Sequence, residues 1–147
     1  MRERVLSIVL GYAAAVLAAS IVITGAIWLP SFWHDIARAD LGFPFVVLRV
    51  VLVAVTGVSL IPAVLGILFA ERKTVRTARA YVAFGAILSV VALLGGLVLF
   101  TPPPGAGLVH ALAFLVAGAL GGLVYWRIAG RAAGLWRPAK AQPAPEA

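Results

Sequence analysis

The residue of this chain whose type most strongly suggests chemistry is an arginine inside an apolar run. Arg49 lies in the run that begins near Phe43, and an ionisable side chain within a membrane span is by default a functional candidate. Thr56 follows seven residues later on the same helical face, and Asp35 and Asp40 in the preceding segment could supply a counter-ion. With His110, these residues predict an outward-facing pocket for an anion, a lipid headgroup or a quinone.

The shallow position of Arg49 in its apolar run supports an alternative interpretation. The residue lies about five positions inside the end of its run, or roughly 7 Å at 1.5 Å per residue. An arginine side chain can cover this distance and keep its charge in the headgroup layer. Arg49 is therefore also interpretable as an interfacial anchor or a clamp on the preceding segment.

Histidines and nucleophiles offer little for catalysis or cofactor binding. His34 and His110 could in principle ligate haem or a metal, but one precedes a span and the other starts one, so we expect interfacial hydrogen bonding and no cofactor. The chain has no cysteine, which excludes thiolate ligands and cysteine nucleophiles. Ser31, His34 and Asp35 fall within one helical turn where their side chains diverge, so helix capping explains Ser31 better than catalysis. We expect no enzyme and no catalytic residue.

Acidic residues are placed where they cannot serve proton-coupled export. That mechanism depends on a carboxylate embedded in the membrane. No acid lies deep within a long apolar run, because the five are Glu3, Asp35, Asp40, Glu71 and Glu146. The sequence also has no ring of polar residues that would indicate a channel.

The elements that position these residues are four long apolar runs. The chain has 147 residues, of which 63% are hydrophobic and only 12% charged, whereas about a quarter of a soluble protein is charged. Each run can cross about 30 Å of hydrocarbon as a helix. The sequence therefore predicts an all-α integral membrane four-helix bundle with spans at about 5–29, 43–70, 78–100 and 106–126.

The first run could instead be a signal peptide, since Arg2 and Arg4 precede it and alanines occupy 13–15 and 18–19. A signal core has only about 7 to 15 apolar residues, and this run continues to Trp28. We expect an uncleaved span.

Positive charges predict the orientation of the bundle. Ten arginines and lysines lie before the first span, between the second and third, or after the fourth, and only Arg38 lies in the opposite connections. Cytoplasmic segments carry this excess, so we expect both termini inside and an up-down-up-down order. The excess of arginine over lysine, among many alanines, glycines and valines, favours a bacterial protein, and we expect it in the inner membrane. The net charge of +7 clusters at span ends, which argues against nucleic-acid binding.

Shorter segments complete the organisation of a 1–137 transmembrane domain. Residues 32–40 are predicted to form a short interfacial helix capped by Ser31, and 138–147 form a disordered tail. The brief connection 71–77 predicts that the second and third spans are antiparallel neighbours. Pro62 should kink the second span, with Thr56 or Ser59 able to satisfy a freed carbonyl.

Small residues at helical spacing predict close helix packing, because lipid supplies no hydrophobic force between helices. The third and fourth runs present such faces, which include Gly85, Ser89, Gly96, Gly118 and Gly122. Gly118 and Gly122 form a GxxxG pair that could bind a second copy or another subunit, although internal packing is the simpler expectation.

Two functional hypotheses follow. The leading one is a non-enzymatic accessory or assembly subunit that acts in the bilayer through helix–helix contacts, with other membrane subunits or its own copies as partners. The alternative is a small transporter or ligand-binding membrane protein with an outward-facing pocket around Arg49.

Overall fold

The computed structural model describes residues 2–34, 42–99 and 108–135, and these residues are helical apart from short turns. The elements are α1 Arg2–His34, α2 Gly42–Lys73, α3 Ala78–Leu99, α4 Leu108–Ile128 and the short 3-10 helix η2 Gly130–Ala132. The side chains of 28–34, 43, 95–99, 109 and 110 lie outside the description. For the part of the chain that is described, the all-α class is confirmed, with four α-helices and no strand.

Three of these helices are long and apolar enough to cross a membrane. They contain the stretches Arg2–Ile27, Pro44–Lys73 and Ala111–Ile128, whereas α3 is described as apolar over the shorter stretch Ala78–Leu94. A span needs about 20 residues because each residue adds 1.5 Å along the axis. Helices of this length and composition are typical of a membrane protein.

Two helices extend further than the apolar runs predicted. α1 continues past Pro30 to His34, so the described start of the predicted 32–40 helix belongs to α1, and 35–40 lie outside the described residues. A proline inside a helix removes one hydrogen bond and crowds the carbonyl four residues before it, and membrane helices tolerate this. α2 runs to Lys73, because charged residues are good helix formers and cations suit a helix C-terminus.

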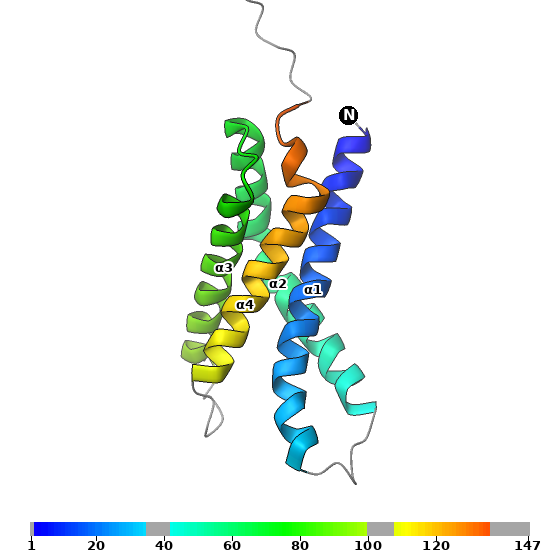
Figure 1. Cartoon of the computed structure of the whole chain (residues 1–147), viewed down its shortest axis with the longest axis vertical. Helices are drawn as coiled ribbons and strands as arrows, with labels where there is room; N and C mark the ends of the chain where they lie inside the picture. Colours follow the sequence, from blue (N-terminus) through cyan, green and yellow to red (C-terminus); the bar gives the residue numbers. More distant parts are fainter. Residues whose placement is uncertain (1, 35–41, 100–107, 136–147) are drawn as a thin grey trace, which may run out of the picture.

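The helices pack unequally. α4 lies along α3 on one side and α1 on the other, and α2 crosses behind them at an angle (Figure 1). The short turn keeps the end of α2 beside the start of α3, but the two helices diverge beyond it and touch little. The prediction that they are close neighbours therefore holds only near the turn, because the small-residue face of α3 packs against α4.

The buried interior is built from small and aromatic residues. One cluster contains Ala70, Tyr81, Tyr125 and Ala129, and a second contains Ala19, Ile23 and Ala117. Most large aliphatic side chains are exposed, among them Val50, Val53 and Ile61 of α2. This inverted distribution is expected where lipid surrounds the helices, since small residues let backbones approach and large ones face the hydrocarbon.

Candidate functional site

The predicted packing glycines lie in the contact between α3 and α4. A methyl group at Gly85 would overlap the carbonyl oxygen of Gly118, and one at Gly122 would overlap the carbonyl of Tyr81. Ser89 packs against Gly118, and its hydroxyl donates to the Ala86 carbonyl at 2.8 Å. Gly96 lies further along α3, in a stretch whose surroundings are not described. The GxxxG pair of α4 is thus occupied by a helix of its own chain.

Of the residues of the predicted Arg49 pocket, only Arg49 and Thr56 have side chains within the described part of the structure. The Arg49 side chain is exposed on α2. Thr56 Oγ1 donates to the Leu52 carbonyl of its own helix at 2.7 Å. Asp35, Asp40 and the side chain of His110 lie outside the described residues. The pocket around Arg49 therefore stays a prediction.

A large cavity lies elsewhere, between α2 and the layer formed by α1, α3 and α4. Its volume is about 880 Å³, and all four helices contribute to its wall. Among the described residues no charged side chain lines it. The polar groups in the wall are the hydroxyls of Tyr12, Ser59, Tyr81, Ser89 and Tyr125. The cavity is therefore an apolar chamber with a few hydroxyl groups.

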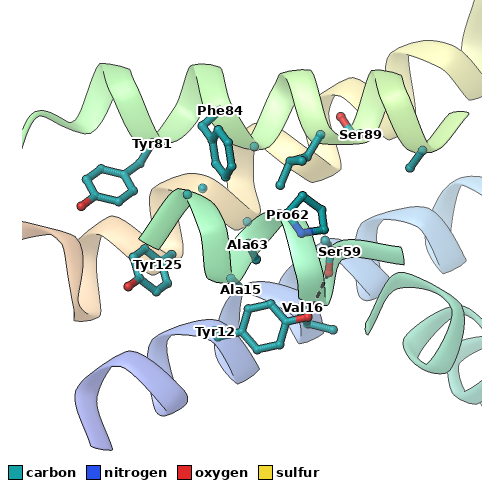
Figure 2. Close-up of a pocket in the computed structure, with 18 of the residues that line it drawn as sticks. Tyr12, Ala15, Val16, Ser59, Pro62, Ala63, Tyr81, Phe84, Ser89 and Tyr125 are labelled. Carbon is teal, nitrogen blue, oxygen red and sulfur yellow. Dashed lines mark hydrogen bonds between the residues drawn. The ribbon is translucent and has the colours of Figure 1, made fainter. Parts of the chain in front are cut away.

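The residues of α2 explain why this space stays open. Pro62 and Ala63 face the cavity in its central part (Figure 2). Ala63 fills little volume, and Gly66 allows the Phe84 ring of α3 to rest against the α2 backbone. α2 thus approaches α3 through one aromatic ring at this level instead of through a continuous face.

Tyr12 of α1 and Ser59 of α2 form a polar link in the cavity wall. Their hydroxyl oxygens are 3.0 Å apart, and Tyr12 Oη lies 3.3 Å from the Thr56 carbonyl oxygen. Pro62 has no amide hydrogen, so the Val58 carbonyl four residues before it loses its helical partner. We expected Thr56 or Ser59 to satisfy this carbonyl, but their described hydrogen bonds go to Leu52 and Tyr12. Sequence reasoning missed Tyr12, although a tyrosine within an apolar run signals a hydroxyl that needs a partner.

At the basic end of the bundle, a buried ion pair joins three parts of the chain. Arg4 pairs with Glu71 and also donates to the Ala129 carbonyl at 2.8 Å. The Gly134 amide donates to the second carboxylate oxygen of Glu71 at 2.8 Å. The two charged side chains are only 15% and 11% exposed. We call these four residues the Arg4–Glu71 clasp.

The clasp holds the start of α1, the end of α2 and the segment after α4 together. Gly134 has a φ of +74°, which a residue with a Cβ rarely adopts, and a methyl group there would also meet Thr74. The sequence pattern had assigned Arg4 to orientation and Glu71 to a connecting segment. Only the fold brings them within reach, since 67 positions separate them.

Two further hydrogen bonds at the basic end join the α2–α3 turn to α4 and to the segment after it. Arg76 Nε donates to the Ala133 carbonyl at 2.9 Å, and the indole of Trp126 donates to the Arg76 carbonyl at 2.7 Å. The rings of Tyr81 and Tyr125 lie 5.6 Å apart at one end of the cavity (Figure 2). This aromatic pair lines the cavity and packs with Ala129 of the clasp.

Neither a cluster of metal ligands nor a similarity to known proteins identifies a ligand for this site. Within 2–34, 42–99 and 108–135, no three histidine, aspartate or glutamate side chains gather as they would around a metal ion. No protein family, curated protein or solved structure matches the chain. The cavity is the feature of the described structure with the size and shape of a binding site.

Proposed function

We propose that this chain is a non-enzymatic, four-span protein of a bacterial inner membrane that binds a membrane-dissolved apolar molecule in its cavity. The observation that carries the proposal is a partly open cavity of about 880 Å³ that is lined mainly by apolar side chains. Small-molecule sites typically measure about 300–1,000 Å³ and have mainly apolar walls. Ligand binding, the alternative hypothesis from the sequence, is thus favoured, at a site different from the Arg49 region.

The apolar wall of the cavity favours a hydrocarbon chain as its ligand. Water gains too few hydrogen bonds in an apolar chamber to fill it stably, and an empty chamber forfeits the dispersion contacts of its wall. A charged solute would lose its hydration without a counter-ion in the described wall. A hydrocarbon chain from the surrounding bilayer meets none of these penalties.

Among the described residues, the small-residue faces of α3 and α4 that motivated an accessory or assembly role, such as Gly85 with Gly118, pack against each other within the chain.

The four-span arrangement and its orientation are part of the proposal. α3 has 22 residues, which corresponds to about 33 Å of helix and matches the hydrocarbon thickness. The start of α1, the α2–α3 turn and the segment after α4 lie at one end of the molecule (Figure 1). This end holds Arg2, Arg4, Arg72, Lys73, Arg76, Arg79, Arg127 and Arg131. The excess supports a cytoplasmic location for it.

A pair of matched substitutions on α2 tests the proposal. Ala63 is buried and lines the cavity, whereas Ala54 is exposed on the same helix. We expect Ala63→Leu to weaken binding of a fluorescent long-chain alkyl probe at least tenfold in purified detergent-solubilised protein, because the added side chain occupies the chamber. Ala54→Leu should leave binding unchanged.

Helix content and the unfolding midpoint of each variant separate filling of the cavity from misfolding. A second variant, Ala92→Leu, fills the cavity from α3 and should repeat the loss. Equal probe binding by wild-type protein and both cavity-filling variants would refute the cavity as a ligand site.

A further inference from the structure

The hydroxyl pair of Tyr12 and Ser59 is the polar feature of the cavity wall best placed to contact a ligand. Figure 2 shows the two side chains meeting from α1 and α2, beside Pro62 and Val16. Both are partly exposed, and both line the cavity. A ligand in the chamber therefore passes within reach of their hydroxyl groups.

The hydrogen bond from the Tyr12 hydroxyl to the Thr56 carbonyl is long. Each of these side chains has one proton to donate. When Tyr12 donates to Thr56, Ser59 donates to Tyr12, and the Tyr12–Thr56 distance of 3.3 Å exceeds the usual 2.5–3.0 Å of an O–H···O bond. The Thr56 carbonyl also accepts the amide four residues on within α2. Tyr12 can thus turn its proton to a ligand without leaving that carbonyl unsatisfied.

The other hydroxyls in the wall are less suited to this role. Ser89 donates to Ala86 at 2.8 Å, and Tyr81 donates to Val75 at 3.0 Å. The hydroxyls of Tyr81 and Tyr125 point away from the remaining labelled wall residues, toward one end of the cavity (Figure 2). Tyr12, whose hydrogen bond to the Thr56 carbonyl is long, is therefore the better donor for a ligand.

The depth of Tyr12 and Ser59 and the uncharged side chains of the described wall favour an uncharged head group on the ligand. Tyr12 lies eight residues from Arg4 and Ser59 twelve from Glu71, or about 12 Å and 18 Å along their helices. An ionised head at this depth would need a counter-ion, and no charged described side chain lines the cavity. An uncharged carbonyl needs only one hydrogen-bond donor.

We infer that the cavity binds an uncharged amphiphile whose carbonyl group accepts a hydrogen bond from Tyr12, supported by Ser59, while its hydrocarbon chain fills the apolar wall. This inference rests on the proposed function and specifies its ligand class. The carbonyl could belong to an acyl ester or to a quinone with an isoprenoid chain.

The test compares probes that differ only in the carbonyl. Full-length protein in mild detergent is titrated with a long-chain ketone and with the alkane and the carboxylate of equal length, each with a straight and an isoprenoid chain, by displacement of the fluorescent probe. A net hydrogen bond of about 1 kcal/mol gives roughly a fivefold preference for the ketone. The chain type that binds better distinguishes the acyl from the isoprenoid source.

Matched tyrosine variants assign that preference to a residue. Tyr12→Phe keeps the ring and should abolish the ketone preference while alkane affinity stays unchanged. Tyr81→Phe removes a hydroxyl from the same wall and should preserve it. Ser59→Ala leaves Tyr12 able to donate and should retain a ketone preference. The unfolding midpoint of every variant confirms that the protein is folded.

Three outcomes would overturn the inference while leaving hydrocarbon binding intact. These are equal affinity of wild-type protein for ketone and alkane, a ketone preference that survives in Tyr12→Phe, and tighter binding of the carboxylate of equal length. Failure of the proposed function looks different, because no probe would then respond to Ala63→Leu.

Discussion

Arg4 and Glu71 stabilise the basic end through contacts that depend on both charges. We predict that Glu71→Ala lowers the free energy of unfolding by about 1.5–3 kcal/mol, the usual contribution of hydrogen bonds to charged groups. The substitution leaves the largely buried Arg4 guanidinium without its carboxylate and the Gly134 amide without its acceptor. Unfolding in mixed micelles with increasing SDS, followed by circular dichroism, measures the change.

Glu3 supplies the control for this prediction, because its side chain is exposed beside Arg4 in the sequence. Glu3→Ala should change stability by less than about 0.5 kcal/mol, as is usual for surface substitutions. The double variant Arg4→Met/Glu71→Met should be more stable than Glu71→Ala, because it leaves no buried charge unpaired. Equal destabilisation by Glu3→Ala and Glu71→Ala would contradict a specific role of the clasp.

Individual functional residues were the part least accessible from the sequence. Arg49 attracts attention because it interrupts an apolar run, yet its side chain is exposed, as the anchor interpretation allows. Glu71 lies beside arginines in a connecting segment by sequence, and its partner is 67 positions away. Tyr12 meets Ser59 only because α2 crosses α1 at this level. Residue type indicates a need for a partner, whereas the fold decides which partner is available.

At the scale of helices, alanine substitution at two helical glycines should change the stability of the bundle in opposite directions. Gly85→Ala should destabilise the bundle by about 1–3 kcal/mol, because the methyl group overlaps the Gly118 carbonyl and a packed contact resists insertion. Gly57→Ala should stabilise it by up to about 1 kcal/mol, since a Cβ at this α2 position meets nothing within 4 Å and alanine favours helix. Both shifts are measured by SDS unfolding. Equal shifts for the two variants would show that the α3–α4 contact is looser than described.

The existence and approximate extent of the helices could be predicted, because each apolar run is long and bounded by charges or prolines. Their ends could not, since Pro30 does not end α1 and polar residues continue α2 to Lys73. Small-residue spacing indicated which faces pack closely. It did not indicate that α2 diverges from α3, because that geometry depends on contacts such as Phe84 against Gly66.

At the scale of the whole molecule, composition alone indicates a membrane protein, and the structure contains three helices of suitable length and apolarity. The cavity was not predictable, because it arises from the angle at which α2 crosses the other three helices (Figure 1). Its wall uses the same alanines and glycines that sequence patterns assign to close packing. Small residues permit close approach, but they leave space wherever the facing helix turns away.

Orientation is also a property of the whole molecule, and the absence of cysteine makes it directly measurable. Thr77 is exposed in the turn at the basic end, and Leu108 is 74% exposed at the start of α4, at the opposite end. With the basic end in the cytoplasm, a membrane-impermeant maleimide applied to intact spheroplasts should label Leu108→Cys and not Thr77→Cys. Membrane disruption should expose Thr77→Cys, which confirms that this thiol is reactive. Labelling of Thr77→Cys in intact spheroplasts would place the clasp outside the cell and contradict the proposed orientation.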